Sequence, residues 1–118
     1  MGTKINYEKY GVSKERYEEL RAFCLQFKEY KTRLRKLKSG VLLCSSAETE
    51  IKILEEKITT IEKCVKQVCN SQPGVYYDLL RNVTEYKCGY ELLLPPMSKN
   101  SFYKLRKDFF VLLNETKK

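Results

Sequence analysis

The stretch Ser98-Lys-Asn-Ser-Phe-Tyr-Lys-Leu-Arg-Lys-Asp-Phe-Phe110 predicts an amphipathic helix near the end of this chain. Ser98 stands in the position of a helix cap. The apolar residues after it recur three, four and three positions apart and share one face: Phe102, Leu105, Phe109 and Leu112. At about 100° per residue, the opposite face is polar, cationic and aromatic: Asn100, Tyr103, Lys104 and Lys107. This pattern is typical of a helix that enters a nucleic-acid groove, and also of an ordinary basic surface helix.

Two longer segments upstream carry apolar stripes with alternating spacings of three and four residues. Residues 13–38 are expected to form one helix, capped by Ser13 and ended by Ser39-Gly40. Residues 46–70 are expected to form a second helix, with Ser45 and Glu48 at the spacing of a capping box. Because the two stripes match, the helices are predicted to pack as an antiparallel hairpin.

Ser71-Gln-Pro-Gly74 breaks the helical pattern and marks a junction between two units. Beyond it, residues 75–87 are expected to form a helix, and residues 90–94 at most two turns before Pro95-Pro96. The predicted fold is all-α. Residues 1–70 would form a long helical hairpin acting as a scaffold or assembly arm, and residues 75–118 a compact helix-turn-helix-like unit.

The residue types that build most catalytic and metal sites are scarce. The chain has no histidine, so the commonest general acid or base is missing. Its five cysteines contain no Cys-x-x-Cys pair, which favours reduced and mostly buried thiols over a zinc site. Glycine-rich phosphate loops and nucleophile elbows do not occur in the sequence. We expect no enzyme activity, no catalytic residue, no metal and no cofactor.

The hydropathy of the sequence indicates a cytoplasmic protein that does not enter a membrane. No segment approaches the roughly 20 apolar residues that a membrane-spanning helix needs. The first residues, Met1-Gly-Thr-Lys-Ile-Asn-Tyr-Glu8, lack the apolar centre of a signal peptide.

The net charge of +8 is distributed unevenly. Residues 1–44 carry eleven Lys or Arg against five Asp or Glu, whereas residues 45–70 carry four against five. Residues 71–118 are again basic, with eight against five. Such blocks are compatible with a polyanionic partner. The basic run Lys28–Lys38 is expected to be a solvated face that complements the helix dipole, with phosphate contact as the alternative.

Several segments of residues 75–118 resemble one family. They are Leu80-Arg-Asn-Val-Thr-Glu85, Gly89-Tyr-Glu-Leu92, Pro96-Met-Ser98, Ser101-Phe-Tyr-Lys-Leu-Arg106 and Phe109-Phe110. They resemble small phage- and mobile-element-encoded transcription regulators of Firmicutes, whose C-terminal helix-turn-helix is similar to sigma-factor region 4. Tyr10-Gly-Val-Ser-Lys-Glu-Arg-Tyr17 and Leu20-Arg-Ala-Phe-Cys24 look like the opening of the same group.

The resemblance implies a DNA-binding regulator of transcription. The positions that match the recognition helix of the family are Lys99, Asn100, Ser101, Tyr103, Lys104 and Lys107. This chain departs from the family pattern in two ways. Asp108 interrupts the basic outer face, and the segment from Gly89 to Ser98 is short and contains two prolines.

The sequence therefore favours a non-enzymatic protein whose last helix contacts the major groove of double-stranded DNA. The alternative is a helical protein–protein interaction module without nucleic-acid binding, for which Ile53, off the main stripe of its helix, is a candidate contact. A homodimer through residues 13–70 is compatible with both interpretations. A cationic surface continuous between Lys99–Lys107 and Lys28–Lys38 would favour DNA, and an exposed apolar patch would favour a protein partner.

Overall fold

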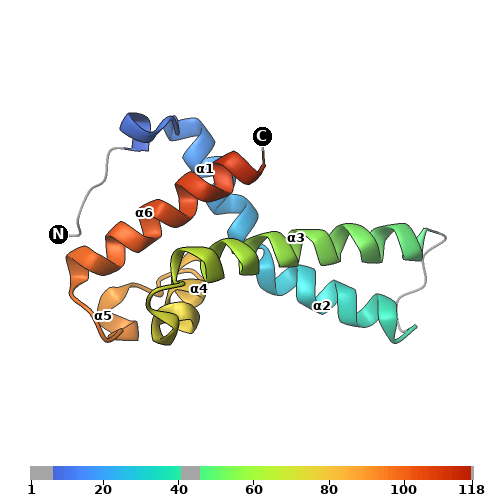
Figure 1. The fold of residues 1–118 in the computed structure, drawn as a ribbon. Helices are drawn as coiled ribbons and strands as arrows, with labels where there is room; N and C mark the ends of the chain where they lie inside the picture. The colour runs from blue at the N-terminus through green and yellow to red at the C-terminus, as the bar shows by residue number, and fades with distance from the viewer. Residues whose placement is uncertain (1–6, 41–45, 118) are drawn as a thin grey trace.

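The computed structural model describes residues 7–40 and 46–117, and every regular element in these ranges is helical (Figure 1). The all-α prediction is confirmed. In chain order the elements are the short 3-10 helix η1 (Tyr7–Tyr10), α1 (Lys14–Leu25), α2 (Phe27–Lys38), α3 (Ala47–Val68), the 3-10 turn η2 (Pro73–Val75), α4 (Tyr76–Thr84), α5 (Tyr90–Leu93) and α6 (Lys99–Thr116). Within the described ranges, no helix combines the length and apolar character that crossing a bilayer requires.

The segment that was expected to be one helix, residues 13–38, is two helices that meet at Gln26. The cap at Ser13 forms as predicted, because its hydroxyl accepts the amide of Arg16 at 3.1 Å. At the break, Gln26 has φ −91° and ψ 5°, and its side-chain amide donates to the carbonyl of Ala22 at 3.4 Å. The break lets α1 contact α4 and α6 while α2 contacts α3. A straight helix could not follow both sets of partners.

Helices α2 and α3 lie side by side and run in opposite directions, and they extend away from the other helices (Figure 1). We call α2 and the first half of α3 the arm. Its interior is apolar, with Leu37, Leu54 and Ile58 buried. Three ion pairs bridge the two helices: Lys31–Glu62 at 3.7 Å, Lys38–Glu55 at 3.0 Å, and Arg33–Glu50. Ser45, the first residue of the expected capping box, lies outside the described residues.

The second half of α3 packs against α6, which also contacts α1 and α4. Four α6 side chains are fully buried in this contact: Phe102, Phe109, Phe110 and Leu113. They belong to one hydrophobic cluster that also contains Leu20 of α1, Ile61 of α3 and Leu79 of α4. Residues from both predicted units, 1–70 and 75–118, therefore contribute to the same core.

Replacing Phe109 by Ala should lower the free energy of unfolding by about 3–5 kcal/mol, because the change removes a fully buried ring and leaves a cavity among four helices. Tyr77→Ala is the matched control, since the Tyr77 side chain is 76% exposed on α4. Chemical denaturation of both variants measures the difference. Similar losses for the two variants would contradict this description of the core.

Candidate nucleic-acid interface at the start of α6

The first turn of α6 is a capped helix end without acidic side chains. The hydroxyl of Ser98 accepts the amide of Ser101 at 3.2 Å, and the Ser98 and Ser101 hydroxyls are 2.9 Å apart. Ser98 has the extended backbone of a cap residue, with φ −67° and ψ 157°. The positive end of the helix dipole favours an anion at this point.

Three of the predicted contact residues are exposed at this helix start: Asn100, Ser101 and Lys104. Lys99 is half-buried, and its ammonium group donates to a carboxylate oxygen of Glu91 in α5 at 2.7 Å. This ion pair holds α5 against the first turn of α6. The structure therefore brings one cation, one amide and one hydroxyl to open surface at the end of the helix that attracts anions.

The other two predicted residues, Tyr103 and Lys107, lie on the flank of α6. Tyr103 is half-buried, with its ring edge-on to Phe102 at 5.9 Å between centroids. The Lys107 side chain is only 15% exposed. Its Nζ lies 2.6 Å from an Asp108 carboxylate oxygen and 4.3 Å from the ring centroid of Tyr10 in η1. The prediction that both residues face outward therefore holds only in part.

The reason for this flank position is a rotation of the buried face of α6. The sequence pattern centred that face on Phe102, Leu105, Phe109 and Leu112. In the structure Leu105 and Leu112 are only partly buried, while Phe110 and Leu113 are fully buried. Phe110 lies edge-on to Tyr7 and Tyr17, so η1 and α1 cover the side of α6 that carries Lys107.

Arg106 fixes this rotation through polar contacts. Its Nε donates to the side-chain oxygen of Asn82 in α4 at 2.8 Å, and its Nη1 donates to the hydroxyl of Tyr7 at 3.3 Å. The guanidinium also lies over the ring of Phe110, 4.9 Å from its centroid. Asn82 is buried and donates in turn to the carbonyl of Cys88 at 3.0 Å. Arg106 therefore connects α6 to η1 and α4, and Asn82 connects α4 to the loop that follows it.

Arg21 of α1 holds the end of α4 from the other side. Its guanidinium donates to the carbonyls of Asn82 at 3.1 Å, Val83 at 2.6 Å and Glu85 at 3.4 Å. These carbonyls belong to the last turn of a helix, where the partial charge is negative and a cation stabilises it. Burial lowers the pKa of Arg21, and the neighbouring charge of Arg106 lowers it further. Neither arginine contact has a local sequence signal, because the partners are distant in the chain.

The basic run Lys28–Lys38 does not continue the surface at the start of α6. Figure 1 shows the end of α2 at the far end of the arm, and α5 with the start of α6 at the opposite end of the molecule. Lys31, Arg33 and Lys38 pair with carboxylates of α3, and Lys28 lies 3.6 Å from a Glu85 carboxylate oxygen. The run mainly ties α2 to its neighbours.

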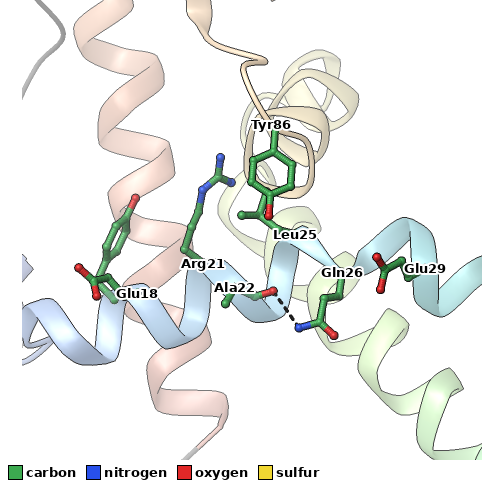
Figure 2. Close-up of a pocket in the computed structure, with 8 residues that line it drawn as sticks. Glu18, Arg21, Ala22, Leu25, Gln26, Glu29 and Tyr86 are labelled. Carbon is green, nitrogen blue, oxygen red and sulfur yellow. Dashed lines mark hydrogen bonds between the residues drawn. The ribbon is translucent and has the colours of Figure 1, made fainter.

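A hollow of about 300 Å³ lies beside the break at Gln26 (Figure 2). Its lining residues are Tyr17, Glu18, Arg21, Ala22, Leu25, Gln26, Glu29 and Tyr86. Figure 2 shows Glu18 and Glu29 at opposite ends, so their carboxylates do not converge on one point. The guanidinium of Arg21 is already bound to carbonyls of α4 and its loop. The hollow accompanies the helix break and gathers no set of reactive groups.

The four cysteines that the structure describes are free and buried: Cys24, Cys64, Cys69 and Cys88. Cys44 lies outside the described residues. Burial raises the pKa of Cys24 to about 12 and that of Cys69 to about 11, which makes both thiols poor nucleophiles. In the described part of the chain, no group of three or more Cys, Asp or Glu side chains is arranged to hold a metal ion.

Replacing Asn82 by Ala should lower the free energy of unfolding by about 2–4 kcal/mol, because Arg106 and the Cys88 carbonyl both lose a buried partner. Asn70→Ala is the control, since Asn70 is exposed after the end of α3. Denaturant unfolding distinguishes the two. A loss no larger than that of the control would show that the Arg106 contact does not hold α6 on α4.

The titration of Tyr7 tests its buried position beside Arg106. Burial raises its pKa from 10.0 to about 12, although the charge of Arg106 opposes this. Because the folded state keeps the proton more tightly, Tyr7 contributes stability that is complete below about pH 10 and is lost as the pH rises to 12. Ultraviolet titration should reveal a phenol near pH 12 that disappears in Tyr7→Phe and remains in Tyr86→Phe. Identical curves for wild type and Tyr7→Phe would refute the buried position.

Comparisons with protein-family models, with curated proteins and with solved structures found no match to this chain.

Proposed function

We propose that this chain is a non-enzymatic regulator of the transcription-factor type that binds double-stranded DNA, with the first half of α6 in the major groove. One observation carries the proposal. Buried phenylalanines hold α6 on the core, while Asn100, Ser101 and Lys104 remain exposed at its start. Recognition helices of helix-turn-helix proteins contact bases with the same N-terminal part.

The chemistry at this end of α6 suits DNA. The hydroxyl of Ser101 and the positive end of the helix dipole can bind phosphate oxygens, which position a protein on the duplex. The Asn100 side chain has both a donor and an acceptor, the pair that reads the major-groove edge of adenine. Lys104 follows one turn later on the same exposed face and can bind a phosphate or a guanine edge.

The order of helices supports the same function. α4, the single turn α5 and α6 follow one another as in a helix-turn-helix unit, and Arg106 and Arg21 fix α4 against α6 and α1. A rigid support of this kind keeps an exposed helix in one orientation when it meets a duplex. The resemblance of residues 75–118 to phage-type regulators agrees with this assignment.

The contact is limited to the beginning of α6. Asp108 is half-exposed and Glu115 is exposed further along the helix, and carboxylates there would meet phosphates unfavourably. Lys107 adds positive charge to the groove only from the flank, because Tyr10 covers its amine. The proposed contact set is therefore Lys99, Asn100, Ser101 and Lys104, with Tyr103 and Lys107 at its edge.

Fluorescence anisotropy with a mixed-sequence duplex tests the proposal over a series of salt concentrations. The logarithm of the binding constant should fall with the logarithm of salt at roughly −0.9 per phosphate neutralised. Lys104→Gln should weaken binding and reduce the magnitude of that slope by about 1. Lys36→Gln is the matched control, since Lys36 is also an exposed lysine and its replacement removes the same charge from α2, far from the start of α6 (Figure 1).

Absence of binding at low salt would exclude the proposed function. Equal effects of Lys104→Gln and Lys36→Gln would mean that binding follows total charge and not the start of α6. Concentration-dependent association without DNA binding would instead favour the protein-interaction alternative, for which Ile53, 47% exposed on the arm, is the candidate contact.

A further inference from the structure

One carboxylate already lies at the start of α6, where the helix dipole favours an anion. It belongs to Glu91 in α5, and one of its oxygens accepts a hydrogen bond from the ammonium group of Lys99 at 2.7 Å. The side chain of Glu91 is 69% exposed and that of Lys99 is 35% exposed, so the pair lies at the surface. Lys99 also belongs to the proposed contact set for DNA. The same ammonium group therefore has a carboxylate partner within the protein and a phosphate partner in the proposed complex.

The single turn α5 keeps the Glu91 carboxylate in place. The hydroxyl of Tyr90 donates to the carbonyl of Met97 at 2.7 Å, and the Tyr90 ring lies 5.9 Å from the ring of the fully buried Phe102. The turn ends at Leu94, whose amide donates to the carbonyl of Tyr90 at 2.8 Å and whose φ of 45° lies in the left-handed region. The residue before Glu91 is thus anchored to the core, and the carboxylate is part of an ordered surface.

The contact between Glu91 and Lys99 favours the charged form of both groups. The hydrogen bond from Lys99 lowers the pKa of Glu91, with a smaller contribution from the backbone amide of Glu91 itself. The same hydrogen bond raises the pKa of Lys99. A phosphate that approaches Lys99 at neutral pH therefore meets a carboxylate that already carries its full negative charge.

We propose that Glu91 competes with DNA phosphates for Lys99, and that this competition lowers the affinity of the start of α6 for DNA. The inference rests on the proposed function and adds an autoinhibitory contact to its site. A phosphate that binds Lys99 must displace the carboxylate, and because α5 is anchored, the displaced carboxylate stays near the phosphate and repels it. Lys99 therefore adds little to DNA binding while Glu91 is present. Lys104, which has no ion pair in the part of the chain that the structure describes, remains available.

The variant Glu91→Gln tests the competition, because glutamine keeps the size of the side chain and removes its charge. In fluorescence anisotropy with a mixed-sequence duplex, it should bind several-fold more tightly than wild type. The slope of the logarithm of the binding constant against the logarithm of salt should grow in magnitude by about 0.9, since one more phosphate is neutralised. Glu48→Gln is the matched control, because Glu48 is an exposed carboxylate in the first turn of α3, at the far end of the arm (Figure 1).

A double-mutant cycle with Lys99→Gln shows whether Glu91 acts through Lys99. Lys99→Gln alone should change the affinity and the salt slope little, because the carboxylate already occupies that ammonium group. In the Glu91→Gln background, the same replacement should abolish the gain in affinity and return the slope to its wild-type value. Thermal unfolding midpoints verify that each variant keeps the fold, as expected because exposed ion pairs contribute little to stability.

The possible outcomes separate this inference from the proposed function. If Glu91→Gln binds no more tightly than wild type or than Glu48→Gln, the competition is overturned. A gain that persists when Lys99 is also replaced overturns it as well, because Glu91 would then act on the DNA directly. A gain that requires Lys99 supports the competition. Absence of duplex binding by both wild type and Glu91→Gln at low salt refutes the proposed function itself.

Discussion

The hydrogen bond from Arg106 to Asn82 is the interaction on which the arrangement of this molecule depends. It joins the middle of α6 to the buried end of α4. Arg21 of α1 donates hydrogen bonds to the backbone carbonyls at that same end of α4. Because Arg106 projects from α6 next to Phe110, satisfying it turns Phe110 into the core as well. The rotation of α6 about its axis follows from this, and with it the set of side chains that remains exposed at the helix start.

Local patterns were sufficient to predict that the chain is helical and where two of its caps lie, but not where the first long helix breaks or that α1 contacts α4 and α6. Both serine caps form where the sequence predicts them, at Ser13 and Ser98, because a cap involves only residues three positions apart. The break at Gln26 could not be predicted, since Phe23, Phe27 and Tyr30 keep a helical spacing across it. What bends the chain there is the difference between the partners of α1 and those of α2, which are distant in sequence.

In the candidate site, too, some features follow from the local sequence and others depend on residues that are distant in the chain. The exposure of Asn100 and Lys104 follows from the period of α6 alone. The covering of Lys107 depends on Tyr10, almost a hundred positions earlier in the chain, and no pattern within the helix contains that information. The exposure of Leu94 could not be predicted for another reason. In the apolar run Tyr90-Glu-Leu-Leu-Leu94 it resembles a core residue, and only its backbone angles and exposure distinguish it.

Helix α3 packs against α2 along one part of its length and against α6 along another. Its 22 residues span about 33 Å, with Leu54 buried in the arm at one end and Cys64 next to Thr116 of α6 at the other. Helix α2 packs against α3 in the arm, and α1, which joins α2 at the break, packs against α4 and α6. Helix α3 therefore contributes both to the packing of the arm and to the packing of α6, so a substitution on α3 can alter both parts of the molecule.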